Sequence, residues 1–530
     1  MHTLTDEQNT IKNAALNNTT GTHIIGGHAG TGKTALLCNI ITTLIKQNKT
    51  VHVLAPTAAA LSVLEDRLPT SDLIRFRTVA AVAQTPQETL SLGDSAPSFP
   101  LTGDGLTRFA DFMDALSLPH SDLVTAYDTT TDTTTPVNCA TPHAVLGGRD
   151  KLIRVDTDQL NARLHTYFNG TSPFRCSITT RADYLTAGQC AQKIANMGAD
   201  FPDAVVVDEF SMVNSQEADI LIHAVASRGG LFLASGDPHQ LEPVTGEVNP
   251  YIRSTEGAHD TFTTHALTTI LRSDDTVSML ANRVRQGTRL VDLAIAGDIQ
   301  RVDSPQPEEL IATYPELFTT ADVVVTFRNA VVDVFNSLLR SLHGLTGAVQ
   351  PTDRLVCNAN VHDAHGFAFR NGEIVDVVNT GQAIPGIARD LGWIRHRASA
   401  QNTGVLSQFL SFIDAGIIIG AEVTNRAGTS KTAFVWADPG TVDKQTHALL
   451  AGAINRLHAE NTIEACLIDT SFAHALTVHK AQGSEWNSVV YVATQSDLDL
   501  QRTSNAPYTA ISRAKHTITV LYSTQRIVTR

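Results

Sequence analysis

The hydrophobic positions of this chain form short continuous runs separated by polar loops. Runs rich in valine, isoleucine, leucine and alanine occupy residues 23–26, 51–57, 204–210, 231–237, 322–327, 487–494 and 516–522. Buried parallel strands have this pattern, and their functional side chains follow the carboxyl ends of the strands. The first two runs lead into the helical patterns ALLCNIITTLIK and AAALSVLEDRL. The early and late groups of runs predict an α/β protein with two lobes, each built on a parallel sheet.

Two regions interrupt this pattern. Residues 85–185 are rich in Thr, Asp, Ser, Pro and Gly and have weak helical periodicity, which predicts a loop-rich insertion. Residues 346–461 contain the strand-like stretches RNGEIVDVVNTG and KTAFVWADPG, which predict a small β-rich module. The predicted organisation is lobe 1 at 1–84 and 186–275, lobe 2 at 276–345 and 462–530, and insertions at 85–185 and 346–461.

Composition narrows the class of protein. The chain has 530 residues, of which 42% are hydrophobic and 17% charged, as in ordinary globular proteins. Without an apolar stretch of about 18 residues, no membrane span is expected, and the polar N-terminus resembles no secretory signal. The 6 cysteines are scattered without a CxxC pair, which argues against zinc ribbons and disulfide scaffolds. We expect a cytoplasmic protein, of a cell or of a phage acting in its host.

The net charge of −14 argues against a protein that coats nucleic acid by bulk charge. A nucleic-acid site would therefore be a local groove of a few cations, hydroxyls and backbone amides.

The stretch GHAGTGKT follows a predicted strand and opens a predicted helix, and it fits the pattern G-x-x-x-x-G-K-[ST]. Glycines let the backbone N–H groups turn toward a phosphate, and the helix N-terminus adds partial positive charge. Lys33 is expected to reach the β- and γ-phosphates, and the Thr34 hydroxyl to bind Mg²⁺. The residues predicted to surround the phosphates are Gly27, Gly30, Thr31, Gly32, Lys33 and Thr34.

Two further strand ends carry candidate chemistry. In VVVDEF the apolar run is followed by Asp208, which can hold Mg²⁺ through a water, and Glu209, which can polarise an attacking water. In GDPHQLEPV, the amide of Gln240 can contact a γ-phosphate without adding charge, although a plain turn has the same composition. Arg272 and Arg513 are candidates for stabilising charge on a transferred phosphoryl group, although either arginine alone is better explained by a surface ion pair.

These segments occur in a fixed order: GHAGTGKT, LAPTAAA, VVVDEFSM, ASGDPHQLEPV, LTTILRS, VVVTFRNAVVDVFN, LTVHKAQGSEW and YTAISRAK. The series resembles the motifs of superfamily-1 helicases, in the 5′→3′ branch that includes the phage Dda helicase and RecD. TVHKAQGSEW and YTAISRAK are its most specific parts. The resemblance covers both lobes, omits 85–185 and covers 350–460 only loosely.

The resemblance implies roles for individual positions. Lys33, Asp208, Glu209, Gln240, Arg272 and Arg513 take the catalytic positions, with Thr34 and Asp208 at the metal. Gln8 resembles the glutamine that reads adenine, and Gly483 and Glu485 resemble residues near the ribose. Contacts to single-stranded DNA are implied for Pro56, Thr57, Thr477, His479 and Lys480. Gln8 and His479 also have structural alternatives, a surface glutamine and a buried histidine.

The sequence departs from the family in one motif. FRTVAAV has Ala80 where many relatives have a histidine, which removes one expected DNA contact. Relatives use the first insertion as a pin that splits the duplex. Phe99, Phe109 and Phe112 are candidates for it, but core packing is the simpler role for each. The stretch at 370–377 is similar to the SH3-like β-module that relatives carry in lobe 2.

The resemblance implies two RecA-like lobes and an ATP- and Mg²⁺-dependent helicase that moves 5′→3′ on single-stranded DNA and unwinds duplex junctions. Single-stranded DNA and duplex junctions are the expected partners, with replication or recombination proteins as further candidates, and family members often work as monomers. Three alternatives remain: an RNA helicase of the same superfamily, a P-loop ATPase that remodels protein–nucleic-acid complexes without unwinding, and a catalytically idle binding module. The intact set of Lys33, Asp208, Glu209 and Arg513 argues against the last.

Overall fold

The computed structural model divides the chain into two compact units, residues 1–82 with 187–530, and residues 83–186. It describes residues 4–18, 20–92, 98–101, 103–128, 133–139, 151–168, 176–243, 247–253, 262–271, 275–293, 299–363, 366–401, 404–425, 428–439, 444–494, 505–523 and 525. The smaller unit coincides closely with the segment predicted at 85–185.

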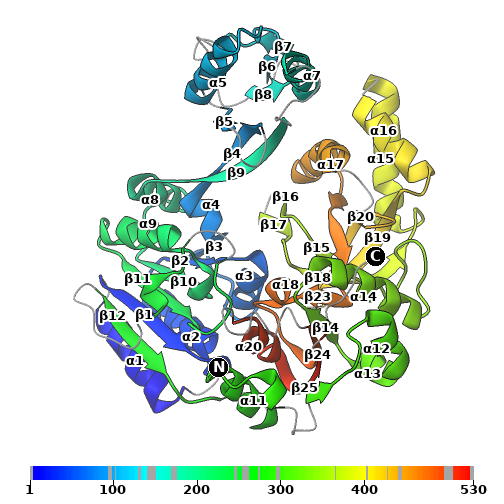
Figure 1. Cartoon of the computed structure of the whole chain (residues 1–530). Helices are drawn as coiled ribbons and strands as arrows, with labels where there is room; N and C mark the ends of the chain where they lie inside the picture. The colour runs from blue at the N-terminus through cyan, green and yellow to red at the C-terminus, as the bar shows by residue number, and fades with distance from the viewer. Residues whose placement is uncertain are drawn as a thin grey trace. The chain divides into compact units, whose positions relative to one another are not determined.

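Lobe 1 is built on a six-stranded parallel sheet in the order β12-β1-β11-β10-β2-β3 (Figure 1). Its strands are β1 (Thr22–Gly27), β2 (Val51–Ala55), β3 (Ile74–Thr78), β10 (Ala204–Val207), β11 (Leu231–Gly236) and β12 (Thr263–Leu267). The strands predicted from the apolar runs are confirmed. β3 and β12 were not predicted, because polar residues interrupt them and both lie at sheet edges.

Successive residues of the inner strands point to opposite faces of the sheet, and both sets are apolar. Helices therefore cover both faces. Ile25, Val53 and Leu233 pack with helices α2 and α3 in one core. On the other side, α9 lies against β11 and packs on α8. The helical segments of this lobe are α1 (Asp6–Asn17), α2 (Lys33–Lys46), α3 (Ala58–Glu65), α4 (Val79–Ala83), α8 (Ala187–Ala195), η1 (Phe210–Met212), α9 (Ser215–Ala226) and α10 (Pro250–Arg253).

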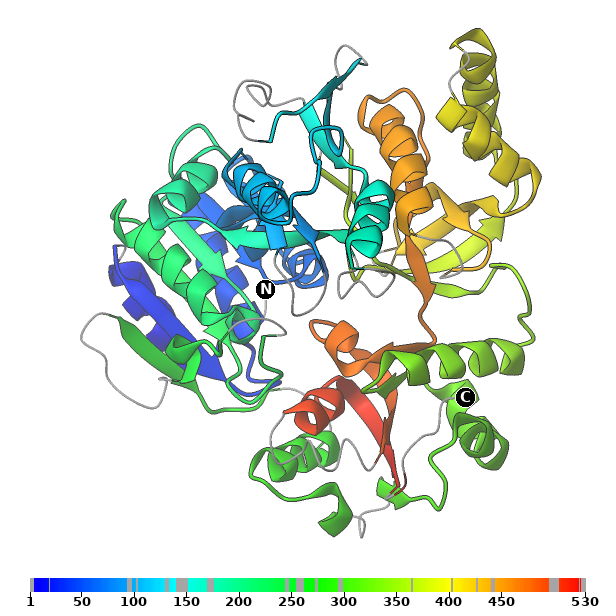
Figure 2. The ribbon, with the colours of Figure 1, turned by 45° about the horizontal axis from the view of Figure 1, so that its top comes forward.

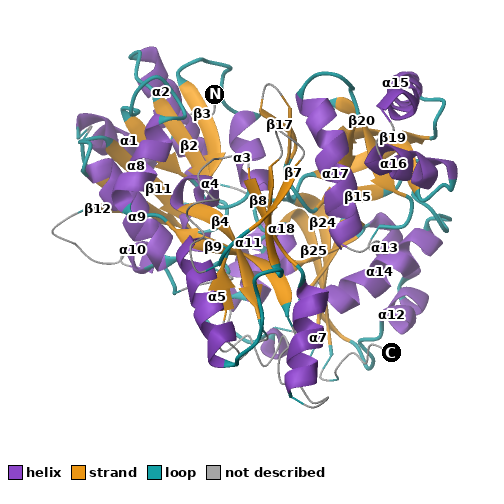
Figure 3. Ribbon diagram, turned by 90° about the horizontal axis from the view of Figure 1, so that it is seen from above, coloured by secondary structure: helices purple, strands orange, loops and turns teal. Residues whose placement is uncertain are grey.

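Lobe 2 has a five-stranded parallel sheet in the order β13-β25-β24-β14-β23. Its strands are β13 (Ile299–Arg301), β14 (Val323–Thr326), β23 (Ala475–Thr477), β24 (Trp486–Ala493) and β25 (Ala514–Tyr522). Its helical segments are α11 (Asp275–Arg285), η3 (Leu290–Asp292), α12 (Pro307–Thr313), α13 (Pro315–Thr320), α14 (Asn329–Leu342), α18 (Val478–Ala481) and α20 (Ala506–Ile511). In Figure 3 the strands of both lobes (orange) lie among helices (purple), so the predicted α/β class with two parallel sheets is confirmed.

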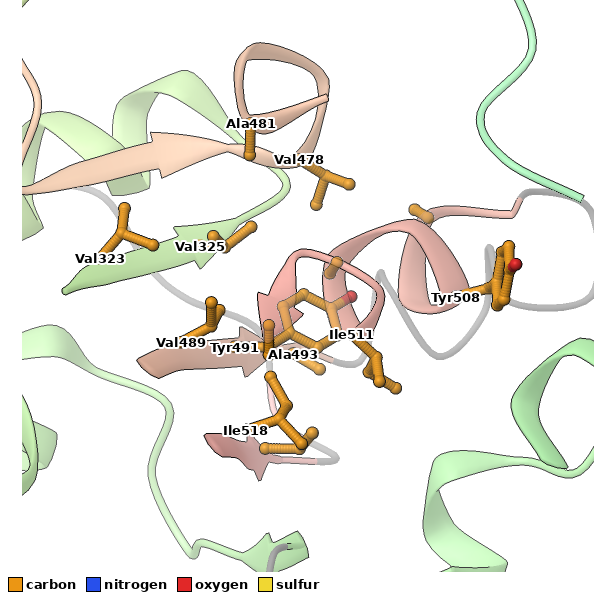
Figure 4. Close-up of a cluster of buried hydrophobic side chains, with 14 of the residues drawn as sticks. Val323, Val325, Val478, Ala481, Val489, Tyr491, Ala493, Tyr508, Ile511 and Ile518 are labelled. Carbon is orange, nitrogen blue, oxygen red and sulfur yellow. The ribbon is translucent and has the colours of Figure 1, made fainter. Parts of the chain in front are cut away.

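The core of lobe 2 brings the late motifs together. Val325, Val478, Tyr491 and Ile511 come from four separate elements and pack in one buried cluster (Figure 4). This packing holds the helix of YTAISRAK, α20, beside the end of β24 and the short helix α18 of TVHKAQ. The motifs TVHKAQGSEW and YTAISRAK, which are separate along the chain, thereby become neighbours in space.

The second insertion contains a six-stranded sheet in the order β21-β20-β19-β18-β15-β22. Its strands are β15 (Arg354–Cys357), β18 (Ile374–Thr380), β19 (Ile418–Asn425), β20 (Ser430–Trp436), β21 (Cys466–Ile468) and β22 (Thr470–Phe472). Only Asp469 separates β21 from β22, so the first and last strands are one continuous segment. The sheet therefore closes on itself, as a small barrel does. It runs past the predicted boundary at 461, and the SH3-like character is not confirmed.

Three helices and a hairpin accompany this barrel, where we predicted a small β-rich module. They are α15 (Pro385–Gln401), α16 (Gly404–Asp414), α17 (Lys444–Ala459) and the strands β16 (Val361–Asp363) and β17 (Gly366–Phe369). α15 and α16 lie beside each other in yellow in Figure 2. The prediction missed a helical signal, because Ile387, Leu391, Ile394 and Ala398 follow helical spacing and are buried.

The unit at 83–186 has two three-stranded antiparallel sheets, ordered β5-β4-β9 and β7-β6-β8. Its elements are β4 (Gln84–Ser91), β5 (Ser98–Pro100), α5 (Gly103–Ala115), β6 (Val124–Asp128), β7 (Thr133–Pro136), β8 (Lys151–Val155), α7 (Thr157–Tyr167) and β9 (Ser177–Tyr184). It is thus more regular than the predicted loop-rich insertion. Phe99 and Phe109 are buried in its core and Phe112 packs against that core, so packing accounts for all three.

Candidate functional site

The loop between β1 and α2 is a phosphate-binding loop in geometry as well as in sequence. Gly30 and Gly32 have φ angles of 83° and 80°, in the left-handed region that residues with a side chain rarely adopt. A Cβ on Gly32 would lie 2.6 Å from Nε2 of Gln8, and one on Gly27 would lie 2.7 Å from Oγ1 of Thr31. The loop therefore needs glycine both for its backbone angles and for its close packing.

Lys33, the first residue of α2, is buried in this loop. Its Nζ donates hydrogen bonds to the carbonyl oxygens of Gly27, at 2.7 Å, and His28, at 3.0 Å. The Thr31 hydroxyl donates to the same His28 oxygen at 2.8 Å. Among the described residues Lys33 is the only buried lysine. Its ammonium group lies among the backbone groups of the loop, where it can donate hydrogen bonds to a bound phosphate.

Asp208 directly follows β10 and lies beside Thr34, the second residue of α2. Its Oδ2 accepts a 2.8 Å hydrogen bond from the hydroxyl of Thr34. Its Oδ1 accepts hydrogen bonds from Ser235 Oγ, at 2.6 Å, and from the N–H of Glu209, at 3.0 Å. A hydroxyl beside a buried carboxylate fits Mg²⁺, which in nucleotide sites takes few protein ligands, several waters and phosphate oxygens.

Glu209 combines three unusual properties. Its backbone is left-handed, with φ 52° and ψ 39°, at a cost of about 1–2 kcal/mol for a residue with a side chain. Its Oε2 atom is buried without a hydrogen-bond partner among the described residues. Burial, reinforced by the charge of Asp208, raises its pKa to about 7 despite the opposing charges of Arg513 and Lys33. A strained, unpaired carboxyl with a pKa near neutrality is suited to accept a proton.

Both lobes line one cavity of about 450 Å³ around these residues. Lobe 2 contributes Arg513, Gly483 and Glu485, and lobe 1 contributes the P-loop and the acidic pair. The predicted site residues that line it are Gln8, Gly30, Gly32, Lys33, Thr34, Asp208, Glu209, Gln240, Gly483, Glu485 and Arg513. Gly27 and Thr31 do not line the cavity but hold the loop in shape. Gly27 does so through its carbonyl bond to Lys33, and Thr31 through its hydroxyl bond to His28.

Arg513 lies just after the C-terminal end of α20, and residues of its own lobe hold its side chain. Its Nε donates to the carbonyl oxygen of Thr509 at 3.0 Å, and its Nη2 donates to the hydroxyl of Ser512 at 3.0 Å. A third bond, of 3.3 Å, joins Nη1 to the carbonyl oxygen of Ser484. All three acceptors are neutral, and Arg513 is only 3% exposed, so its positive charge remains available to an anion in the cavity.

Gln8 forms one end of the cavity. Its side-chain oxygen accepts from the N–H of Thr5 in a capping box at the start of α1, and its Nε2 donates to the carbonyl oxygen of Thr31 at 3.1 Å. The amide is thereby oriented by the P-loop itself. The alternative of a surface glutamine is wrong, since Gln8 is 2% exposed.

Gln240 is buried where the loop after β11 meets lobe 2. Its side-chain oxygen accepts a long hydrogen bond, 3.4 Å, from Nε2 of Gln482. Gln482 itself is 3% exposed, and its Oε1 has no hydrogen-bond partner among the described residues. Gln482 lies inside the segment TVHKAQGSEW but was not among the predicted site residues. Two amides from different lobes thus meet, and the one of Gln240 lines the cavity.

The residues predicted to contact a nucleic-acid strand cap two helices. The Thr57 hydroxyl accepts from the N–H of Ala60 at the start of α3, and the Thr477 hydroxyl accepts from the N–H of Lys480 at the start of α18. Pro56 precedes the first of these caps. A Cβ on Gly483 would lie 3.6 Å from Cβ of Ala60, so the two segments are neighbours.

His479 and Lys480 follow the second cap. The ring of His479 lies 5.6 Å from that of Phe327, at 53°, and burial lowers the pKa of His479. Lys480 Nζ donates to Oδ1 of Asn358 at 3.1 Å, while the Lys480 side chain stays exposed. His479 is therefore a neutral, partly buried ring, and Lys480 is the exposed cation of this segment.

Arg272 lies outside the described residues. Several cavity-lining residues were not predicted, namely Leu4, Thr5, Ala29, Ala35, Ala60, Val63, Arg67 and Leu271. Tyr508 was also missed, although it stands in YTAISRAK. Among the described residues no cluster of three or more His, Cys, Asp or Glu side chains could hold a metal, and no helix there is long and apolar enough to cross a membrane.

Comparisons with known families agree with this two-lobe site. The AAA domain model matches residues 8–246, and the UvrD-like helicase C-terminal domain model matches residues 472–521. The first match contains the P-loop, the acidic pair and Gln240, and the second contains Gly483, Glu485 and Arg513. No curated protein matches the sequence.

Solved structures of Pif1 helicases match nearly the whole chain. The Pif1 helicase from Candida albicans is 15% identical, with a TM-score of 0.45, and the match covers 98% of this chain and 95% of that one. A Bacteroides Pif1 bound to ssDNA is 14% identical, with a TM-score of 0.46, over 98% of this chain and 92% of that one.

Proposed function

We propose that this chain, which is an ATP-hydrolysing helicase of superfamily 1, moves 5′→3′ along single-stranded DNA and separates duplexes ahead of it. The observation that carries the proposal is the single cavity that Lys33 and Glu209 of lobe 1 line together with Arg513 of lobe 2. A phosphate chain bound there contacts both lobes, so its hydrolysis can alter how the lobes meet.

The residues of lobe 1 bind the triphosphate and prepare the water. Lys33 and the N–H groups around Gly30 and Gly32 bind the β- and γ-phosphates. Thr34 and Asp208 hold Mg²⁺, which neutralises charge on the phosphate oxygens when bound. Glu209 accepts a proton from the attacking water, because its unpaired Oε2 and raised pKa suit a general base.

The residues of lobe 2 stabilise the charge that develops during transfer. Arg513 presents a guanidinium whose bonded partners are all neutral groups. Arg272 is proposed as a second arginine at the γ-phosphate. Gln240 contacts the γ-phosphate, and Gln8 reads the adenine edge. Gly483 and Glu485 lie at the ribose.

A nucleic-acid strand is proposed to cross the caps of α3 and α18. Pro56, Thr57, Thr477, His479 and Lys480 provide hydroxyls, a ring and one exposed cation. Such groups hold phosphates and bases locally, which is compatible with a net charge of −14. Since α3 and α18 belong to different lobes and α18 leads directly into Gly483, movement at the cavity reaches the strand.

Strand displacement tests the proposal. The substrates are DNA duplexes with a 5′ tail, with a 3′ tail or with blunt ends, and the matched RNA duplexes, each with ATP and Mg²⁺. The proposal predicts unwinding of the 5′-tailed DNA only. Unwinding of RNA alone favours the RNA-helicase alternative, and DNA-stimulated ATP hydrolysis without displacement favours the remodelling ATPase. Displacement of the 3′-tailed duplex alone contradicts the polarity.

A further inference from the structure

One phenol group joins three segments around the P-loop. The hydroxyl of Tyr508, on α20 of lobe 2, accepts a 3.0 Å hydrogen bond from the N–H of Ala29 in the P-loop. The same hydroxyl donates a 2.6 Å hydrogen bond to Oδ2 of Asp237, at the end of β11. Tyr508 therefore binds the P-loop and the loop that carries Gln240 at the same time.

The neighbours of Tyr508 strengthen this attachment. The Thr509 hydroxyl accepts from the N–H of Leu241 at 3.0 Å, and Nδ2 of Asn505 donates to the carbonyl oxygen of Gln240 at 3.0 Å. Arg513 Nε, in turn, donates to the carbonyl oxygen of Thr509. The arginine that lines the cavity is thus fixed to the segment that is hydrogen-bonded to lobe 1.

The Tyr508 hydroxyl is a strong and permanent donor. Tyr508 is 3% exposed and Asp237 is fully buried. Burial and the neighbouring charge of Asp237 hold the pKa of Tyr508 far above its usual range, so the phenol keeps its proton. The second Asp237 oxygen accepts from the N–H of His239 at 3.0 Å. Because the donor reaches a buried carboxylate, this bond is of the stronger, charge-assisted kind.

We propose that Tyr508 is a positioning residue for ATP hydrolysis, which sets where Arg513 stands relative to the P-loop. The inference rests on the proposed hydrolysis of ATP in this cavity. Unlike Lys33, Tyr508 does not line the cavity proposed to hold the nucleotide. It acts through its hydrogen bonds to Ala29 and Asp237. Its hydroxyl makes the position of the arginine depend on the P-loop, so that lobe 2 is aligned for catalysis when lobe 1 is correctly formed.

The expected effect separates turnover from binding. Without the hydroxyl, α20 loses its bond to the P-loop, and displacement of a catalytic group by about 1 Å can lower a rate by roughly 100-fold. We therefore expect Tyr508→Phe to lower kcat for DNA-stimulated ATP hydrolysis by roughly 10- to 100-fold. KM for ATP should stay within about threefold, because Lys33 and the P-loop amides remain.

The matched control is Tyr522→Phe. Tyr522 is 4% exposed, packs in the same buried cluster and makes no side-chain hydrogen bond among the described residues. Steady-state ATPase kinetics with single-stranded DNA, and thermal unfolding, are measured for both variants and the wild type. A fall in kcat for Tyr508→Phe, without a matching fall for Tyr522→Phe, supports the proposal.

Two results overturn it: an unchanged kcat in Tyr508→Phe, or an equal loss in both variants. If Tyr508→Phe does not fold, Thr509→Val decides, because it removes the neighbouring acceptor, and an unchanged kcat then contradicts the proposal. The wild-type rate separates the two claims. A wild type without ATPase activity contradicts the proposed function, whereas an active wild type matched by an equally active Tyr508→Phe contradicts this inference alone.

Discussion

Thr34 and Asp208 are 174 positions apart in the chain, yet Thr34 Oγ1 donates a 2.8 Å hydrogen bond to Asp208 Oδ2. The bond joins the first turn of α2 to the end of β10, across the carboxyl edge of the lobe 1 sheet. Ser235 and the N–H of Glu209 take the other carboxylate oxygen, so Asp208 is oriented from two sides. This geometry supports the proposal that the pair holds one ion beside the P-loop.

Thr34→Ala and Asp208→Asn should each weaken the response to Mg²⁺. Either change removes one of the two groups proposed at the ion, and losses of about 10- to 100-fold in metal affinity or activity are typical of such groups. The measurement is ATPase rate against Mg²⁺ concentration at saturating ATP. Asp203→Asn is the control, because Asp203 precedes the same strand but pairs with Lys49 at its opposite end. A wild-type Mg²⁺ curve for Thr34→Ala and Asp208→Asn would contradict the assignment.

Glu209→Gln should abolish turnover and leave nucleotide binding intact. A general base contributes roughly 10²- to 10⁴-fold to a rate, and the amide cannot accept the proton. The change also removes a charge from an atom that is buried without a partner, so the variant should be at least as stable as the wild type. Rapid-quench hydrolysis and equilibrium binding of a fluorescent nucleotide distinguish the two effects. Turnover within about twofold of wild type would exclude Glu209 as the base.

The wild type should lose activity on the acid side of neutrality. The pKa of Glu209 is raised to about 7, so the carboxyl is protonated below that pH and cannot act as a base. We expect kcat/KM for ATP to rise with pH through an apparent pKa near 7 and then to level off. The raised pKa also means that the folded chain binds this proton more tightly than the unfolded chain. The contribution of Glu209 to the free energy of unfolding therefore falls as pH rises from 4.5 to about 7. A flat profile between pH 5.5 and 8 would rule out this assignment.

Gln8→Ala should reduce the preference for ATP over GTP by about 5- to 10-fold, the value of one or two net hydrogen bonds. The same change opens the capping box of α1, which costs about 1 kcal/mol of stability. The control is Asn9→Ala, which alters the same helix through the exposed bond to the Leu4 carbonyl oxygen. The measurement is kcat/KM for both nucleotides. Equal selectivity in the two variants would mean that Gln8 is structural only.

The sequence was sufficient to predict the interior strands of both lobe sheets, because buried parallel strands are continuous apolar runs. It also predicted the P-loop and the acidic pair, whose short local patterns carry their chemistry with them. β13 and β23 have three residues each, too few to form a recognisable run. The closure of the barrel through Asp469 depends on pairing between distant strands, which no local pattern encodes.

Tyr508 and Gln482 show what a motif reading leaves out. Both residues stand inside quoted motifs, but their importance lies in contacts with Asp237 and Gln240 of the other lobe. Those contacts depend on how the two lobes meet, and neighbouring sequence does not contain that information. A tyrosine inside the motif YTAISRAK was the one available signal, because a tyrosine hydroxyl that is buried usually has a hydrogen-bond partner.

Arg340→Ala should lower the free energy of unfolding by about 3–5 kcal/mol, because it leaves Asp353 buried without its charge partner. Arg340 Nε and Nη2 donate to Asp353 at 2.7 and 2.9 Å, and the pair joins α14 to the barrel. Arg289→Ala, which breaks a solvent-exposed pair with Asp292, should change the free energy of unfolding far less, because water and salt screen that pair. Urea titration compares them, and equal losses would show that burial of the first pair is unimportant.

Arg513 and Lys33 are proposed to act on one and the same phosphate chain, from the two sides of the cavity. Single-turnover hydrolysis by Arg513→Ala, with ATP affinity measured on the same sample, tests this directly. Arginines that stabilise a transferred phosphoryl group contribute roughly 10³- to 10⁵-fold, so hydrolysis should fall by that order while Lys33 still holds the nucleotide. Arg513→Lys should restore little, because an ammonium cannot replace the planar guanidinium. Hydrolysis by Arg513→Ala at the wild-type rate would contradict the proposed role of Arg513 at the transferred phosphoryl group.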